Sequence, residues 1–260
     1  MIDSVAPAAA GASSPPLKAP GVAVRGAGLR YDRRCHFETL DFDLRPGETT
    51  CLLGPSGVGK SSLLRLIAGL GQPGLSGRVS ADDGQPLTGR LALMAQQDHL
   101  LPWASVLDNV MLGDRLRGAA PDADRARDLL RRLGLVAATG LRPGALSGGM
   151  RQRVALARTL YEGSPVILMD EPFSALDAVT RHRLQGEAAA WLTGRTVLLV
   201  THDPLEALRL GHRLLVLAGQ PARLREVAVP PAPVPRPAGD PLLAAAQDRL
   251  LAALAAEAPP

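Results

Sequence analysis

Residues 54–61 read Gly54-Pro55-Ser56-Gly57-Val58-Gly59-Lys60-Ser61. The apolar run Thr49–Leu53 precedes this stretch and apolar residues at helical spacing follow it, which predicts a strand, a loop and a helix in that order. This is the G-x-x-x-x-G-K-S pattern of a P-loop in the context that the pattern requires. Glycines there let backbone N–H groups converge on phosphate oxygens, Lys60 places its charge on the β- and γ-phosphates, and Ser61 offers its hydroxyl to Mg²⁺. The stretch therefore predicts a nucleotide site rather than a glycine-rich turn with a coincidental lysine.

Composition limits the classes of protein to which the chain can belong. Its 260 residues are 46% hydrophobic, which is enough for one substantial core, and alternating strand-like and helix-like segments favour a single α/β domain. Cys35 and Cys51 alone cannot support a disulfide framework. The net charge of +4 comes from scattered arginines, so nucleic acid is not expected as a partner. No apolar stretch approaches the roughly 20 residues of a membrane helix, and residues 1–20 lack a signal-peptide pattern, so we expect neither self-insertion nor export.

The patterns along the chain predict its organisation. Val166–Met169 and Thr196–Val200 are short apolar runs with a helical stretch between them, as in a βαβ unit of a parallel sheet. Between them and the P-loop, helical patterns replace the β-branched runs. The predicted organisation is a disordered tail at 1–20, an α/β domain at 21–228 with a helical subdomain inserted at about 100–162, a Pro-rich spacer at 229–241 and a short C-terminal helix at 242–260.

Two carboxylates follow the first of these two apolar runs. The run Val166–Met169 is followed by Asp170 and Glu171, the shape of a Walker B element. Ligands of a parallel sheet gather at the carboxyl ends of its strands, so Asp170 is expected beside the P-loop, holding Mg²⁺ directly or through water. Glu171 is then placed to accept a proton from the water that attacks the γ-phosphate; an acidic helix cap is the alternative.

A second glycine-rich motif identifies a family. Leu146-Ser147-Gly148-Gly149-Met150, followed by Arg151-Gln152-Arg153, resembles the signature motif of ABC ATPases. The resemblance implies an α/β fold: a P-loop NTPase (RecA-like) core with a mainly parallel sheet, an antiparallel β subdomain and an inserted α-helical subdomain. Ser147 and two glycines at a helix start would form a second anion-binding nest. In the family this nest caps ATP held by the opposite protomer, which implies a homodimer.

The other family motifs follow in order. Gln96 resembles the Q-loop glutamine, Ser174-Ala175-Leu176-Asp177 the D-loop, and His202 the switch histidine, while Tyr31 stands where the family has its adenine-stacking aromatic. Plain packing is the alternative for Tyr31. The resemblance implies Glu171, His202 and Gln96 as catalytic residues, Ser61, Gln96 and Asp170 as Mg²⁺ ligands, and as ATP-binding residues Tyr31, Gly54, Pro55, Ser56, Gly57, Val58, Gly59, Lys60, Ser61, Ser62, Ser147, Gly148, Gly149 and Asp177.

The segment after Gln96 points to a branch of the family. Residues 96–103 include Leu100-Leu101-Pro102-Trp103 and resemble the importer ATPases for nitrate, sulfonates, taurine and the hydroxymethylpyrimidine precursor of thiamine. The sequence of residues 94–98 resembles the hydroxymethylpyrimidine type most, so that solute is favoured. By family analogy Leu100, Leu101 and Trp103 would receive the coupling helix of a permease, or else pack the subdomain. The chain departs from the commonest pattern at Ala95 and Met150, neither of which is a catalytic position.

These motifs imply partners as well as chemistry. We expect a homodimer on the cytoplasmic face of the bacterial inner membrane, bound to permease subunits and acting indirectly with a periplasmic or extracellular solute-binding protein. A soluble ABC ATPase of translation or DNA repair is disfavoured, because that class typically carries paired cassettes or coiled-coil insertions. A regulatory module with 230–257 as its effector is also disfavoured, because that segment is too short for a folded sensor domain.

Overall fold

The computed structural model describes residues 19–31 and 34–257. Positions 1–18 of the predicted tail lie outside these residues. Ala19 and Pro20, its last two positions, are buried, and the Pro20 carbonyl accepts a hydrogen bond of 2.7 Å from the Thr196 hydroxyl. These two residues therefore belong to the domain, although the predicted boundary lies at residue 21.

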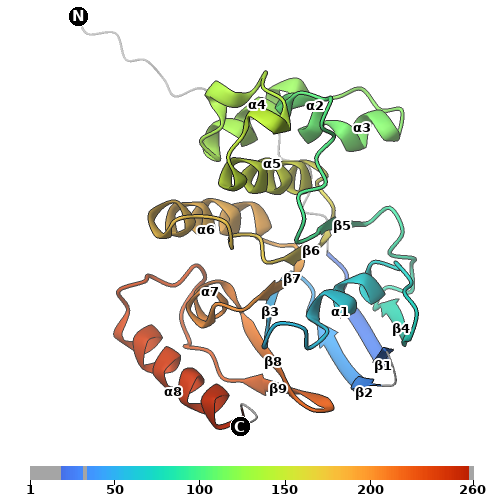
Figure 1. The fold of residues 1–260 in the computed structure, drawn as a ribbon, viewed down its shortest axis with the longest axis vertical. Coiled ribbons are helices and arrows are strands. Elements are labelled where there is room, and N and C mark those ends of the chain that lie inside the picture. Colours follow the sequence, from blue (N-terminus) through green and yellow to red (C-terminus); the bar gives the residue numbers. More distant parts are fainter. Residues whose placement is uncertain (1–18, 32–33, 258–260) are drawn as a thin grey trace, which may run out of the picture.

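One mixed sheet organises the described part of the chain (Figure 1). The spatial order of its strands is β4-β1-β2-β9-β8-β3-β7-β6-β5. The strands are β1 (Val22–Tyr31), β2 (Arg34–Leu44), β3 (Thr49–Leu53), β4 (Leu75–Ala81), β5 (Leu91–Met94), β6 (Val166–Asp170), β7 (Thr196–Thr201), β8 (Arg213–Gly219) and β9 (Ala222–Val227). Strands β5, β6, β7, β3 and β8 are parallel, whereas β1 pairs antiparallel with β2 and β4. The predicted parallel core and antiparallel β subdomain are both present.

Helices cover this sheet and form a separate lobe above it (Figure 1). They are α1 (Lys60–Ile67), α2 (Val106–Val110), α3 (Leu112–Leu116), α4 (Ala123–Arg132), α5 (Gly148–Tyr161), α6 (Ala178–Leu192), α7 (Pro204–Leu210) and α8 (Pro241–Glu257), with 3₁₀ turns at Val136–Ala138 and Pro143–Ala145. Helices α2 to α5 fall within the range predicted for the inserted subdomain, 100–162.

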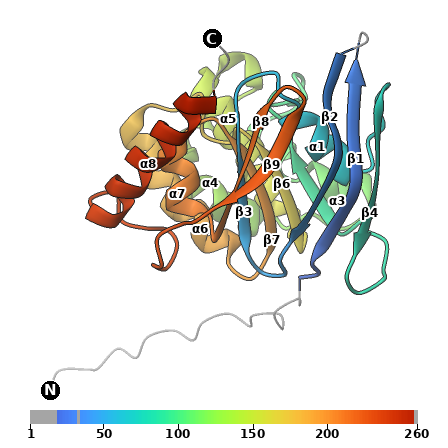
Figure 2. The ribbon, with the colours of Figure 1, turned by 90° about the horizontal axis from the view of Figure 1, so that it is seen from below.

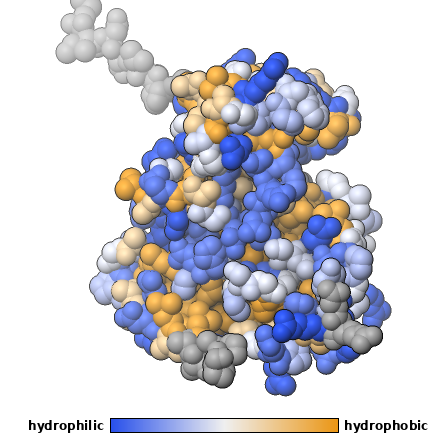
Figure 3. All heavy atoms as spheres, in the orientation of Figure 1, coloured by the Kyte–Doolittle hydropathy of each residue, from blue (hydrophilic) through white to orange (hydrophobic). Residues whose placement is uncertain are grey.

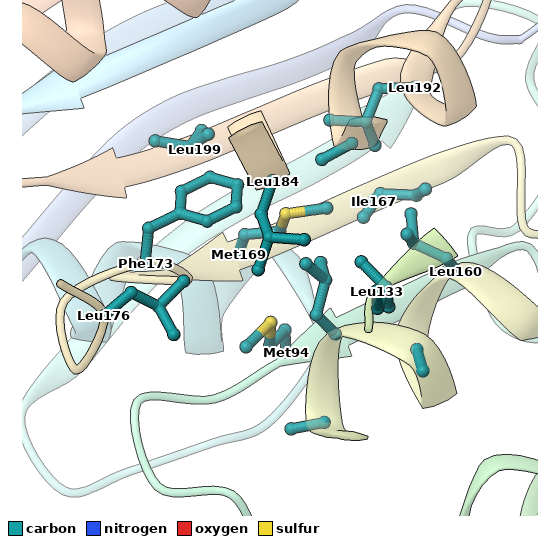
Figure 4. Packing of buried hydrophobic residues seen from close by; sticks show 14 of the residues in the cluster. Met94, Leu133, Leu160, Ile167, Met169, Phe173, Leu176, Leu184, Leu192 and Leu199 are labelled. Carbon is teal, nitrogen blue, oxygen red and sulfur yellow. The ribbon is translucent and has the colours of Figure 1, made fainter. Parts of the chain in front are cut away.

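Two apolar clusters explain why the strands are buried on both faces. Every residue of β3, β6 and β7 is buried, as continuous apolar runs of a parallel sheet require. One cluster joins α5 and α6 to one face of the sheet, and Figure 4 shows Leu160 of α5 and Leu184 of α6 in it together with Met169 of β6. The other cluster joins α1 to the opposite face through Leu63 and Leu64. The carboxyl ends of these strands are thereby held rigidly between two layers of helices.

The proline-rich segment at 229–241, predicted as an extended spacer, is anchored to α7. Arg236 is 3% exposed, and its guanidinium donates to the carbonyls of Leu208, Gly211 and Pro230 at 2.6 to 2.9 Å. Arg209 of α7 donates to the Arg236 carbonyl in return, at 3.1 Å. Burial lowers the pKa of the Arg236 guanidinium, but hydrogen bonds to carbonyls compensate for lost water.

Helix α8 then docks beside α7, as Figures 1 and 2 both show. One face of α8 carries the contact, because Leu243, Ala246 and Leu250, which recur at helical spacing, are buried. Leu242 and Leu251 stay exposed on the outer side of α8, and Figure 3 shows apolar surface gathered over this part of the molecule. The C-terminal segment is therefore part of the domain rather than a free extension.

Arg236→Met should lower the free energy of unfolding by about 2–4 kcal/mol, because three buried carbonyls lose their donor while the apolar stem is kept. Urea denaturation followed by circular dichroism measures this change. Arg127→Met is the matched control: its partner Asp124 is almost fully exposed, so a change below about 0.5 kcal/mol is expected. Equal stability of the two variants would show that Arg236 does not anchor the segment.

Candidate functional site

The loop between β3 and α1 has the geometry that the sequence predicts. Gly57 and Gly59 have φ angles of 77° and 108°, which favour glycine. A Cβ on Gly59 would lie 2.5 Å from Cε1 of Phe37, so a side chain is excluded there on steric grounds as well. No side chain caps the start of α1, which leaves its first backbone N–H groups free to bind an anion.

Lys60 points back into this loop. Its side chain is nearly buried, and Nζ donates to the carbonyls of Gly54 and Pro55 at 2.8 and 2.9 Å. Burial lowers the pKa of Lys60, while the charges of Glu171 and Asp170 raise it in part. A single ammonium group is thus held where phosphate oxygens would approach the loop.

Asp170 ends β6 beside the P-loop helix. It is 6% exposed, and burial raises the pKa of its carboxyl while a hydrogen bond with the Ser61 side chain and the charge of Lys60 lower it. A hydroxyl and a carboxylate are the oxygen ligands that Mg²⁺ prefers. Within residues 19–31 and 34–257, no three His, Cys, Asp or Glu side chains cluster as a metal site. The pair therefore fits an ion that takes its other ligands from phosphates and water.

The three predicted catalytic residues meet at the ends of three adjacent strands. Glu171 follows β6, His202 follows β7 and Gln96 lies just after β5. The Nδ1 atom of His202 lies 3.0 Å from Oε1 of Glu171, and Nε2 of Gln96 donates to Oε2 at 3.5 Å. Glu171 is mostly buried, whereas His202 is 57% exposed. The carboxylate is thus held within reach of both partners.

A pocket of about 900 Å³ opens over the P-loop. Its walls include Gly54, Gly57 and His202, which the sequence singled out, and residues that it did not. The latter come from three places in the chain: Arg34, Cys35 and His36 of β2, Gly219 and Gln220 of the β8–β9 turn, and Leu254 of α8. These residues belong to no sequence motif, so only the fold could show that they line the pocket.

Tyr31 does not line this pocket but is paired across two strands with a residue that does. It is 60% exposed at the end of β1 and pairs with Arg34, which lines the pocket. Because an exposed phenol packs against little, Tyr31→Ala should raise the apparent KM for ATP several-fold through the loss of a stacking contact of about 1 kcal/mol, with kcat little changed. Steady-state ATPase assays test this, and an unchanged KM would refute the stacking role.

The signature residues Ser147, Gly148 and Gly149 do not line the pocket over the P-loop. Ser147 caps α5 by accepting a hydrogen bond of 3.2 Å from the Met150 N–H, and Gly148 lines a hollow of about 480 Å³. This hollow shares no lining residue with the pocket over the P-loop. Asp177 caps α6 by accepting from the Thr180 N–H at 3.0 Å. The predicted ATP contacts of Ser147, Gly148, Gly149 and Asp177 are therefore not brought to the P-loop within one chain.

Comparison with known proteins agrees with these motifs. The family model described as ABC transporter matches residues 37–174. The aliphatic sulfonates import ATP-binding protein SsuB 1 of Rhodococcus jostii is 46% identical over 89% of this chain and 92% of its own length. SsuB 3 of Nocardia farcinica is 45% identical over 90% of each chain. This chain belongs to the ABC transporter ATP-binding family.

Solved ABC cassettes share its fold. The dimeric structure of the bacterial ABC transporter cassette MJ0796 is 28% identical, has a TM-score of 0.67 and covers 75% of this chain and 93% of the cassette. A post-hydrolysis state of that cassette, bound to ADP and Pi, is 30% identical, has a TM-score of 0.69 and covers 79% of this chain and 98% of the cassette. The predicted fold class and the predicted nitrate, sulfonate and taurine importer family are confirmed. As an ABC importer subunit, the chain binds and hydrolyses ATP to drive transport.

Proposed function

We propose that this ABC ATPase powers the import of aliphatic sulfonates. The observation that carries the proposal is the 45–46% identity, over almost the whole chain, to proteins named for aliphatic sulfonate import. Hydroxymethylpyrimidine, favoured from the wording of residues 94–98, has no counterpart among these relatives, and sulfonate import, an alternative in the same branch, replaces it. The ATPase subunit does not contact the solute in this scheme, so the solute must be tested on the assembled transporter.

The site supports a mechanism of ATP hydrolysis in which different residues bind the phosphates, bind Mg²⁺ and accept a proton. The P-loop amides and Lys60 bind and orient the phosphates, and Ser61 and Asp170, with Gln96 nearby, would hold Mg²⁺, which would screen phosphate charge. Glu171 accepts the proton of the attacking water as general base. His202, 3.0 Å from Glu171, orients that carboxylate and reaches toward the γ-phosphate. These assignments rest on the convergence of the three strand ends.

Two copies of the chain are needed to complete each site. Ser147, Gly148 and Gly149 do not line the pocket over the P-loop, so one copy does not enclose ATP with both the signature nest and the P-loop. A partner that offers its Ser147, Gly148 and Gly149 to the γ-phosphate would complete the enclosure. The related cassette MJ0796 has been solved as a dimer, which supports this arrangement. Closure around two ATP molecules would turn the permease outward, and hydrolysis would reopen the dimer.

The surface that receives the permease is smaller than predicted from sequence. Trp103 is 69% exposed, but Leu100 is buried in the core cluster, because Asn109 fixes this turn by bonding the N–H and carbonyl of Leu101. Leu100 therefore packs the subdomain, and its predicted docking role is wrong. The proposed contact rests on Trp103 with partial support from half-buried Leu101. Such attachment would place the chain on the cytoplasmic face of the inner membrane; no helix among the described residues is long and apolar enough to cross a bilayer.

Trp103→Ala should abolish stable assembly with the permease while leaving the ATPase rate of the free subunit unchanged, because an exposed indole contributes to docking and not to folding. Co-purification with the permease and a parallel ATPase assay measure the two effects. Leu242→Ala, an exposed apolar residue on α8, is the matched control and should assemble normally. Retained assembly of the Trp103 variant would refute the docking role.

The decisive test of the proposed function is ATP hydrolysis by the subunit assembled with its permease in lipid, with and without the solute-binding protein. Aliphatic sulfonates, taurine, nitrate and hydroxymethylpyrimidine are compared. Stimulation by an aliphatic sulfonate alone is the expected result. Stimulation by one of the other solutes instead would overturn the substrate, and normal basal turnover without any stimulation would exclude this importer branch.

A further inference from the structure

Gln152 is a buried polar residue that the predicted roles leave unused. It lies in α5, one turn after the signature glycines, and is 8% exposed. Its amide directs three hydrogen bonds to a single stretch of chain: Nε2 donates to the Glu171 carbonyl at 2.8 Å and to the Ser174 hydroxyl at 3.1 Å, and Oε1 accepts from the Ala175 N–H at 2.8 Å. The amide thus spans the segment from the general base to the D-loop.

That segment begins in an unusual conformation. Glu171 has a φ of 50°, a left-handed conformation that a residue with a side chain adopts only when its surroundings hold it there. Its N–H donates to the Val200 carbonyl at 2.9 Å, which secures one side. Its carbonyl accepts from Gln152 and, more weakly, from the N–H and hydroxyl of Ser174 at 3.3 and 3.1 Å. Gln152 makes the shortest of the three bonds and is the only one of these donors from outside the segment.

The start of α5 also packs tightly on the same segment. A Cβ on Gly149 would lie 3.1 Å from the Ala175 carbonyl oxygen and 3.3 Å from Cδ2 of Leu176. The signature end of the helix and the start of the D-loop are therefore in direct contact within one chain. A displacement of α5 would reach the Glu171 peptide through a fixed hydrogen bond rather than through a mobile loop.

We propose that Gln152 is a positioning residue: it holds the backbone of Glu171 from the signature helix, so that the general base is aligned only when α5 is in place. The proposal rests on the proposed role of Glu171. Gln152 contacts neither the P-loop nor the pocket over it, so it should act on the rate of hydrolysis and not on nucleotide affinity. Through it, the helix that offers Ser147 to the partner's ATP also governs hydrolysis in its own chain.

Two variants of the full-length subunit, assembled with the permease in lipid, test this. Gln152→Leu keeps the approximate volume and removes all three bonds, whereas Gln152→Glu keeps an acceptor for Ala175 and removes only the donors to Glu171 and Ser174. Both should lower kcat by about tenfold to a hundredfold, as displacements of a catalytic group do. Nucleotide affinity, measured separately with a fluorescent ATP analogue, should change by less than about twofold.

Thr159→Val is the matched control, because it removes one buried hydrogen bond of α5 far from Glu171 and should leave kcat unchanged. If the leucine variant does not fold, the glutamate variant decides alone. Normal kcat in Gln152→Glu, or a loss of affinity equal to the loss of kcat, would overturn the proposal. Glu171→Gln, measured in parallel, separates the proposed role of Glu171 from that of Gln152. Normal turnover in Glu171→Gln would refute the role of Glu171 as general base. An inactive Glu171→Gln beside an active Gln152→Glu would refute only the positioning role of Gln152.

Discussion

Glu171→Gln should reduce kcat for ATP hydrolysis by about a thousandfold while ATP still binds, because the substitution removes the proton acceptor and keeps the size of the side chain. The amide can still bond Gln96 and His202, so the convergence of the three strand ends is kept. The P-loop, Lys60 and Asp170 are untouched. Binding and hydrolysis should therefore separate cleanly in this variant.

The same variant should accumulate as a dimer with ATP and Mg²⁺. If closure follows binding and reopening follows hydrolysis, a subunit that binds without hydrolysing remains closed. Light scattering after gel filtration, with ATP and with ADP, measures the mass of each state. Glu226→Gln is the control, since it removes a half-exposed carboxylate that pairs with Arg213, away from the three strand ends, and should behave as the parent. A monomer that hydrolyses ATP at the normal rate would contradict both the base and the dimer.

The sequence predicted the elements that carry strong local signals. Thr49–Leu53 is a strand with the predicted limits, and the strands of the βαβ unit differ from prediction by one residue at one end. Continuous apolar runs between a glycine-rich loop and a carboxylate pair have few other interpretations in a parallel sheet. The same local signals placed the P-loop, Asp170 and Glu171 at one end of the sheet, and the structure brings them together there.

Other features depended on contacts between distant segments. Strands β8 and β9 and helix α7 were not predicted individually, and the stretch that contains Arg236 was predicted only as a Pro-rich spacer at 229–241. The Arg236 side chain can be buried because the fold brings three carbonyls within hydrogen-bond distance of its guanidinium. For Leu100, permease docking and packing of the subdomain both stayed open, because the sequence gives no sign that Asn109 turns the chain inward. In α5 a signal did exist, since Gln152 is a polar residue one turn before the apolar, buried Ala155 and Leu156.

Lys60→Ala should weaken ATP binding by about 3 kcal/mol, or roughly a hundredfold, because the phosphates lose a charge-assisted contact to a nearly buried ammonium group. The substitution also removes contacts in the protein without ATP, since Nζ donates hydrogen bonds to the carbonyls of Gly54 and Pro55.

Lys60→Arg should rescue little of that affinity, because the space that holds a compact ammonium between two carbonyls does not accommodate a planar guanidinium. Calorimetric titration with ATP and Mg²⁺ compares both variants with Arg65→Ala, which removes an exposed cation from the same helix and should bind as the parent does. If Lys60→Arg bound ATP normally, charge alone would explain the role of Lys60, whereas weak binding by both variants requires the geometry of the loop as well.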